Sequence, residues 1–326
     1  MYESFYGLRE SPFNLTPDPQ FFYLGENHRE ALAQLIYGVR EKKGFIVLTG
    51  EVGTGKTTII RCFLETLMNG SNNTKAVFLF NPKLSVNDFI QYILRDLDLT
   101  IQGISKGEYL NTLYEYLINA YQKEEKVVLI VDEAQGLDPL LLEEIRLLSN
   151  LETSKSKLLQ IVLVGQPELS QTLSRPNFRQ IRQRINLQSH LPPLTEKEAG
   201  EYIQKRLKIA GRKDPLFMKG AVKEIYRKTD GVPRLINVLC DNSLLIGFAS
   251  DKKLIDKKIV QEAAKDLKMG QKYPTTWKWL IPAIAIVGAT LSFAILQGKS
   301  GFLTGLLQRL QPLKEIIENG LQHIFR

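Results

Sequence analysis

A glycine-rich loop that could wrap around phosphate lies early in the chain. Residues 50–57 read Gly-Glu-Val-Gly-Thr-Gly-Lys-Thr, after an apolar run at 45–49 and before a helical pattern. Glycines let backbone N–H groups and a helix N-terminus face an anion closely. Lys56 would contact the β- and γ-phosphates of a nucleotide, and the Thr57 hydroxyl would bind Mg²⁺. We therefore predict a nucleotide site formed by Gly50, Glu51, Val52, Gly53, Thr54, Gly55, Lys56, Thr57 and Thr58.

Two carboxylates follow another apolar run. Asp132 and Glu133 come directly after residues 127–131, which suit a strand buried on both faces. Open α/β sheets bind ligands at the carboxyl ends of their strands. Asp132 would hold the Mg²⁺ through water, and Glu133 would act as the general base toward an attacking water. The presence of Glu133 favours hydrolysis over a nucleotide-binding switch.

Four further polar residues could sense or stabilise the reacting phosphate. Gln166 follows an apolar run at 158–164 and is a candidate γ-phosphate sensor, although it could instead cap a turn. Arg184, and as second choice Arg182, could stabilise transition-state charge from a neighbouring subunit, or could form a solvated basic face. Arg234 follows a Gly-Val-Pro turn and could reach the nucleotide from a helix start, or could form a structural ion pair.

These residues need a scaffold that brings strand ends together. Short apolar runs at 45–49, 76–80, 127–131 and 158–164 alternate with helical patterns. This alternation predicts an α/β fold, a parallel sheet sandwiched by helices, over residues 1–194. Charged helical patterns follow, beginning with a capping-box sequence at 195–198, and predict a small helical lid domain over 195–270.

The C-terminal part has a different composition. No charge occurs between Lys278 and Lys299, and about twenty helical residues span roughly 30 Å, the thickness of one bilayer core. We expect a basic linker at 271–278, a transmembrane helix at 279–297 and an amphipathic tail at 298–326; a buried core helix is the alternative. Basic residues flank both ends, so charge alone does not orient the span. The lack of a signal-peptide pattern and the nucleotide chemistry favour a cytoplasmic domain before the span and a tail on the other side of the membrane.

The composition narrows the class of protein. Of the 326 residues, 44% are apolar and 24% charged, which excludes a largely disordered chain, and two distant cysteines exclude a disulfide scaffold. The formal net charge is +8. Anionic lipid would attract each basic residue near the expected span by about 1 kcal/mol. Nucleic acid is the rival partner, but the sequence has no aromatic-basic interleaving and no zinc-finger spacing.

With these motifs in view, the sequence resembles a P-loop NTPase of the AAA+ class, and more narrowly the general secretion pathway protein A (ExeA-like) family. That family includes short relatives associated with exopolysaccharide and exosortase (PEP-CTERM) loci. The resemblance covers roughly residues 1–270. It depends on the strings at 5–8, 11–13, 16–19, 28–32, 132–135, 147–152 and 163–169.

The resemblance implies ATP and Mg²⁺ as cofactors and a homo-oligomeric ring, expected to have six subunits, in which Arg184 acts on the next subunit's ATP. It also implies an inner-membrane-anchored ATPase that drives or regulates assembly of an envelope export system. The 29 residues after the expected span are too few for the family's peptidoglycan-binding region. We therefore favour a function in polysaccharide export or protein sorting over cell-wall remodelling. The alternatives are a DNA-linked ATPase of the transposition or replication type and a membrane-tethered nucleotide switch.

Overall fold

The computed structural model describes residues 1–269 apart from 17, 70–72, 81–82 and 101–104. Met1–Gly270 form one compact unit, and residues 271–326 form a second unit that lies outside the described residues. The predicted linker, transmembrane helix and tail therefore all lie outside the described part. Among the residues that are described, no helix has both the length and the apolar character needed to cross a membrane.

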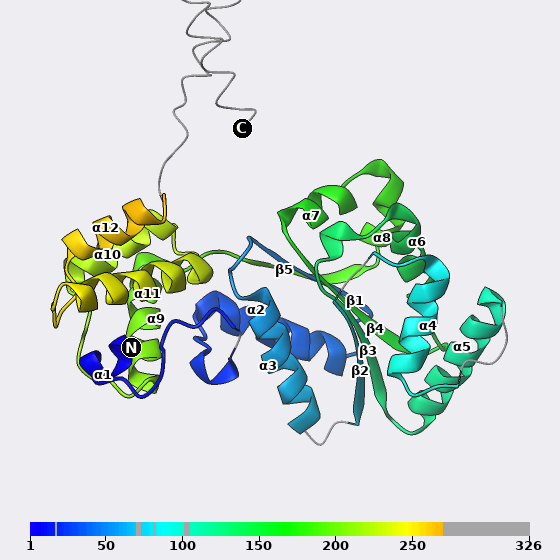
Figure 1. The fold of residues 1–326 in the computed structure, drawn as a ribbon. Helices are drawn as coiled ribbons and strands as arrows, with labels where there is room; N and C mark the ends of the chain where they lie inside the picture. The colour runs from blue at the N-terminus through cyan, green and yellow to red at the C-terminus, as the bar shows by residue number, and fades with distance from the viewer. Residues whose placement is uncertain (17, 70–72, 81–82, 101–104, 270–326) are drawn as a thin grey trace, which may run out of the picture. The chain divides into compact units, whose positions relative to one another are not determined.

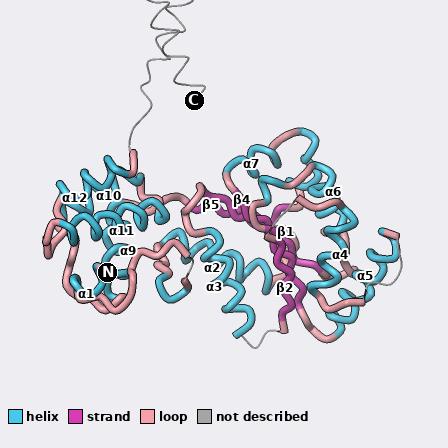
Figure 2. Tube along the Cα trace, viewed as in Figure 1, coloured by secondary structure: helices cyan, strands magenta, loops and turns pink. Residues whose placement is uncertain are grey.

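Five parallel strands form one sheet in the order β2-β3-β4-β1-β5 (Figures 1 and 2). Their bounds are β1 (Phe45–Gly50), β2 (Thr74–Leu79), β3 (Lys126–Val131), β4 (Leu159–Gly165) and β5 (Ile185–Leu191). The predicted parallel sheet is confirmed. Strand β5 was not predicted, because alternate residues along this edge strand are polar and one of its faces is largely open to solvent.

Helices cover both faces of the sheet (Figure 1). On one face, Ile46, Leu48 and Val162 pack against α2 (Glu26–Arg40) and α3 (Lys56–Asn69). On the other face, the alternate residues Val47 and Ile161 pack against another group of helices. This group comprises α4 (Val86–Asp96), α5 (Lys106–Gln122), α6 (Pro139–Leu148), α7 (Pro167–Leu173) and α8 (Arg179–Arg182). Because every residue of β1 and β4 is buried, these strands read as continuous apolar runs in the sequence.

The helical region after the sheet contains α9 (Glu196–Ile209), α10 (Lys219–Thr229), α11 (Pro233–Ala249) and α12 (Lys257–Asp266). Helix α9 begins with the predicted capping box, in which the Thr195 hydroxyl accepts from the Glu198 N–H and the Glu198 carboxylate accepts from the Thr195 N–H. These helices form their own apolar core, and we refer to them as the lid.

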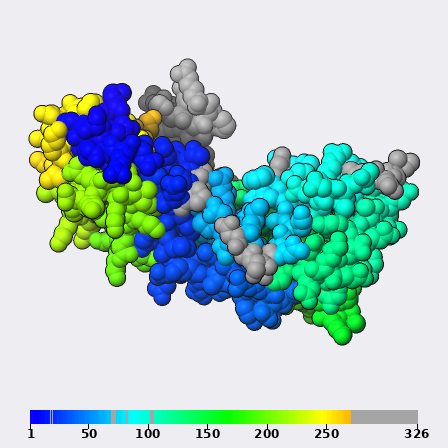
Figure 3. Space-filling model, turned by 90° about the horizontal axis from the view of Figure 1, so that it is seen from below, coloured from blue at the N-terminus to red at the C-terminus, as the bar shows by residue number. Residues whose placement is uncertain are grey.

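The N-terminal segment, which the sequence assigned to the nucleotide-binding domain, packs into the apolar core of the lid. Helix α1 (Tyr2–Tyr6) packs against α11, and Phe13 meets Phe217 edge to face. The Tyr6 hydroxyl donates to the Lys252 carbonyl at 3.1 Å. Figure 3 shows the blue N-terminal residues lying on the green and yellow lid. The sequence pattern did not reveal this because the contacts join residues more than 200 positions apart.

A tight turn between α10 and α11 contacts the segment that connects β5 to α9. Gly231 has a φ of +75°, and its carbonyl accepts from the Leu194 N–H at 2.9 Å. A Cβ atom at Gly231 would lie 1.9 Å from the Leu194 carbonyl oxygen, so no side chain fits there.

Gly231→Ala should lower the free energy of unfolding by about 2 kcal/mol or more, because the backbone must leave its left-handed conformation and separate from Leu194. The matched control is Gly200→Ala within α9, where the added Cβ would meet Val222 Cγ1 at an ordinary 3.5 Å. That control should stabilise the protein by about 0.5–1 kcal/mol. Urea unfolding of residues 1–270 at constant m measures both changes. Equal midpoints for Gly231→Ala and the wild type would contradict the prediction.

Candidate active site

The glycine-rich loop connects the end of β1 to the start of α3, as predicted. Gly53 and Gly55 have φ values of +81° and +99°, which side-chain-bearing residues rarely adopt. The buried Thr54 hydroxyl donates to the Glu51 carbonyl at 2.9 Å and closes the loop on itself. The loop therefore places backbone N–H groups and the N-terminus of α3 around one point, which is the arrangement that binds phosphate.

Lys56 points back into this loop. Its Nζ donates to the carbonyls of Gly50 and Glu51 at 2.8 and 2.9 Å, and the residue is buried. Burial lowers the pKa of Lys56, while the carboxylates of Glu133 and Asp132 act in the opposite direction. The ammonium group thus lies between the loop and the two strand-end carboxylates, where it can contact terminal phosphates.

Thr57 and Asp132 meet at the end of β3. The Thr57 hydroxyl donates to Asp132 Oδ2 at 3.0 Å, and the Glu133 N–H donates to Asp132 Oδ1 at 2.8 Å. Burial raises the pKa of Asp132. A hydroxyl and a carboxylate fit Mg²⁺, which takes few protein ligands and completes its shell with water and phosphate oxygens. In the described part of the chain, no cluster of three or more His, Cys, Asp or Glu side chains could hold a metal alone.

The predicted base and the predicted sensor lie together. Glu133 is exposed and has a left-handed backbone, with φ 52° and ψ 34°. Its Oε2 accepts from Gln166 Nε2 at 3.4 Å, and Gln166 stands at the N-cap of α7, directly after β4. Thr49 and Gly165 are paired in the register of β1 and β4, which brings Gln166 to the same sheet edge as the loop.

The lid also touches the loop. Arg234 is the second residue of α11, and its backbone N–H donates to the Gly53 carbonyl at 3.2 Å. Its side chain is exposed and lines the same pocket as Lys56, Glu133 and Gln166. The structure thus brings Arg234 to the site, and it adds a main-chain contact that the sequence did not predict.

Arg184 and Arg182 do not reach this pocket. Arg184 precedes β5, whose first residue, Ile185, is in register with Phe45 at the start of β1. A six-residue strand spans about 20 Å, so Arg184 lies at the opposite edge of the sheet from Gly50. Arg182 Nη1 donates to the Ser174 carbonyl at 3.3 Å.

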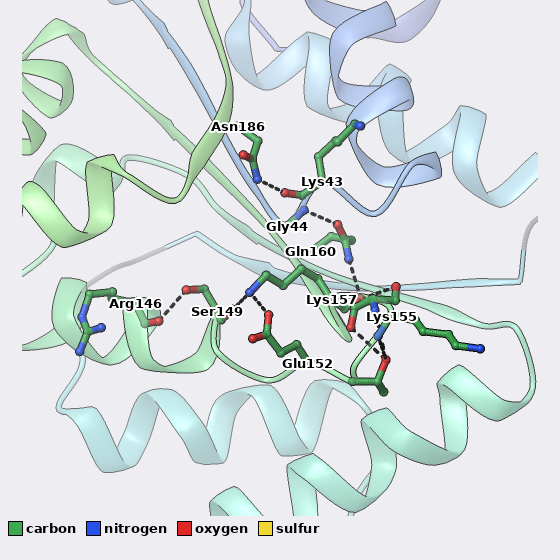
Figure 4. Close-up of polar contacts among 11 residues, drawn as sticks. Lys43, Gly44, Arg146, Ser149, Glu152, Lys155, Lys157, Gln160 and Asn186 are labelled. Carbon is green, nitrogen blue, oxygen red and sulfur yellow. Dashed lines mark hydrogen bonds and ion pairs between the residues drawn. The ribbon is translucent and has the colours of Figure 1, made fainter.

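The edge of the sheet near Asn186 carries a network of polar contacts (Figure 4). Gln160 Oε1 accepts from the Gly44 N–H at 2.7 Å, and Lys157 pairs with Glu152. Lys157, and to a smaller extent Arg184, lowers the pKa of the Glu152 carboxyl. Within one chain, this edge and the nucleotide pocket are separate.

The pocket extends from the loop into a cleft between the N-terminal segment and the lid, and its volume is about 350 Å³. The sequence predicts only a general neighbourhood for the base, near Phe13 and Phe21, and Phe21 lines this part of the pocket. This part is lined by side chains from both segments, including Asn14, Leu15, Phe21, Tyr23, Tyr202 and Asn237. Aromatic and amide groups of this kind suit the base and sugar of a nucleotide.

Arg206 holds the wall of this cleft together. Its buried guanidinium donates to the Pro12 carbonyl at 2.5 Å, the Asn14 carbonyl at 3.2 Å and the Tyr202 hydroxyl at 2.7 Å. The guanidinium carbon lies 5.0 Å from the centre of the Phe21 ring. Because Arg206 follows Pro12 by 194 residues, only the folded chain shows that it shapes the pocket.

His28 supports the loop from the other side. Its Nε2 is 3.1 Å from the Thr54 carbonyl oxygen, and a Cβ at Gly55 would lie 3.4 Å from the same nitrogen. Burial lowers the pKa of His28. In the sequence, His28 belongs only to the segment 28–32 on which the family resemblance partly depends. Nothing in its local pattern predicts a contact with the loop.

Comparisons with known proteins agree with this geometry. Residues 39–173 match a family model described as an AAA domain. The chain is 40% identical over 292 residues to general secretion pathway protein A of Aeromonas hydrophila, a match covering 89% of this chain and 52% of that protein. It is 25% identical over 257 residues to an uncharacterised HTH-type transcriptional regulator of Methanocaldococcus jannaschii, covering 73% and 60% of the two chains. The chain thus spans only about half to three fifths of the length of these relatives.

Solved structures show the same fold at low identity. Drosophila ORC bound to DNA matches with a TM-score of 0.60 and 17% identity, covering 78% of this chain and 64% of the ORC chain. Cdc6p of Pyrobaculum aerophilum matches with a TM-score of 0.59 and 20% identity, covering 78% and 70%. The phosphate loop and the strand-end carboxylates both lie within the residues that match the AAA domain. The chain as a whole is similar to general secretion pathway protein A, over about half of that protein's length.

Proposed function

We propose that the chain hydrolyses ATP at the pocket formed by the glycine-rich loop, the end of β3 and the lid. The observation that carries the proposal is the convergence of Thr57, Asp132 and Lys56 beside an exposed Glu133. Mg²⁺ held by Thr57 and Asp132 would neutralise phosphate charge. Lys56 and the loop N–H groups orient the phosphates. Glu133 takes a proton from a water that attacks the γ-phosphorus, and the bond to the ADP oxygen breaks.

Gln166 and Arg234 would report the state of the nucleotide. Gln166 already contacts the proposed base, so an amide that turns toward the γ-phosphate would change the environment of Glu133. Arg234 joins the lid to the loop through its own backbone, so a loop that adjusts to the phosphates would move the start of α11. ATP binding and hydrolysis would thus be coupled to the lid and to the N-terminal segment packed in it.

A homo-oligomeric ring, which we propose to have six subunits, would complete the site. Arg184 lies at the opposite edge of the sheet from the loop, so it would reach the nucleotide of a neighbouring subunit. A guanidinium from the neighbour would stabilise the charge of the transition state. Arg182 is the second candidate for this role.

We further propose that the ATPase domain lies in the bacterial cytoplasm, anchored to the inner membrane by residues 279–297, with residues 298–326 on the outer side. The uncharged run of that segment and the similarity to general secretion pathway protein A support this proposal. The partner system would be an envelope export apparatus, for secretion, polysaccharide export or protein sorting. A DNA-linked ATPase is the second candidate, because one relative is an HTH-type transcriptional regulator by name and one similar structure is bound to DNA.

One experiment separates these functions. ATP turnover by residues 1–272 is measured at several protein concentrations, with anionic vesicles, zwitterionic vesicles or duplex DNA. We expect turnover per subunit to rise with protein concentration and with anionic vesicles, because rings assemble and basic residues bind the lipid surface. Stimulation by DNA alone would make the DNA-linked function the leading one, and turnover independent of concentration would contradict the shared site.

A further inference from the structure

Gln135 joins the proposed base to the proposed sensor. Its Nε2 donates to Glu133 Oε2 at 2.5 Å, and its Oε1 accepts from the Gln166 N–H at 3.0 Å. Glu133 Oε2 also accepts from Gln166 Nε2 at 3.4 Å, so the three residues form a closed ring of contacts. One amide side chain thus connects the residue after β3 to the residue after β4.

The surrounding backbone makes room for this amide. Gln135 lies in the short 3₁₀ helix η2 (Ala134–Gly136), which follows the left-handed Glu133. A Cβ at Gly165 would lie only 2.8 Å from Gln135 Oε1 and 3.0 Å from Leu169 Cδ2. The absence of a side chain at Gly165 is therefore what lets Gln135 reach the first turn of α7.

We propose that Gln135 is a positioning residue for ATP hydrolysis, an inference that rests on the proposed function. Glu133 is exposed, and a free carboxylate on the surface would sample several rotamers, few of which face an attacking water. The charge-assisted hydrogen bond from Gln135 restricts that carboxylate. The bond from Gln135 to the Gln166 backbone fixes the carboxylate relative to the strand end that carries the sensor.

The test is Gln135→Met in the full chain, which keeps the side-chain length and removes both hydrogen bonds. We expect kcat to fall about 10- to 100-fold, as when a reacting group is misplaced by about 1 Å, with KM and ATP affinity unchanged. Gln171→Met is the matched control, since Gln171 is an exposed glutamine on α7, and it should leave kcat unchanged. Gly165→Ala is a second variant whose Cβ displaces the Gln135 amide, and it should lower kcat in the same direction.

The outcomes are distinct. A wild-type or raised kcat in Gln135→Met, with Glu133→Gln inactive in parallel, would overturn the positioning role and leave the proposed function standing. Continued turnover by Glu133→Gln would instead contradict the proposed function itself. If Gln135→Met does not fold, Gly165→Ala decides, and an unchanged kcat in that variant overturns the inference.

Discussion

Replacing Glu133 by Gln should abolish steady-state ATP turnover and leave ATP binding intact. The amide cannot take the proton of the attacking water, so kcat should fall by about 10²- to 10⁴-fold, the usual contribution of a general base. Lys56, Thr57 and the loop N–H groups, which we propose to hold the phosphates, are unchanged. Single-turnover hydrolysis and the binding of a fluorescent ATP analogue measure the two effects separately.

The control for this substitution is Glu168→Gln. Glu168 is an exposed carboxylate on α7 that contributes to the electrostatic environment of Lys56, so the control removes the same charge near the site. Its turnover should stay close to that of the wild type. If Glu133→Gln bound ATP and turned it over at the normal rate, Glu133 would not be the base.

Arg184→Ala should abolish turnover in a different way. A guanidinium supplied by a neighbouring subunit contributes about 10³-fold or more to phosphoryl transfer, and its loss should lower kcat to that extent. ATP affinity should stay nearly unchanged, because Arg184 lies at the far edge of the sheet from the loop of its own chain. Arg182→Ala, two residues earlier, should have the smaller effect. Turnover and ATP affinity of each variant, measured at concentrations where rings form, check these expectations.

Mixing the two inactive variants tests the site between subunits directly. Where an Arg184→Ala subunit supplies Glu133 and a Glu133→Gln neighbour supplies Arg184, the site contains both functional groups. Turnover should therefore appear in mixtures and reach a maximum at an intermediate ratio, while each variant alone stays inactive. A complete lack of activity at every ratio would show that Arg184 does not act on a neighbour's nucleotide.

Local sequence was sufficient for the part of the site that depends on neighbouring residues. The glycine-rich loop needs a strand before it and a helix after it, and β1 and α3 flank it as predicted. The carboxylates at 132 and 133 follow a strand whose residues are nearly all buried. Its apolar run therefore predicted a strand that ends directly before them. The position of Gln166 at a strand end also followed from its pattern, because parallel strands align their carboxyl ends.

Tertiary structure alone decided the rest. Arg206 meets Pro12 and Asn14 across about 190 residues, and Gln135 meets Gln166 across 31. Such contacts depend on how separate elements pack, and a single sequence carries no local pattern for them. The sequence by itself therefore determined the phosphate loop, the strand-end acids and the parallel sheet, since hydrophobic periodicity and glycine spacing are local properties. Packing determined the part of the pocket that Arg206 shapes and the place of the N-terminal segment within the core of the lid. It also determined the ring of contacts among Glu133, Gln135 and Gln166.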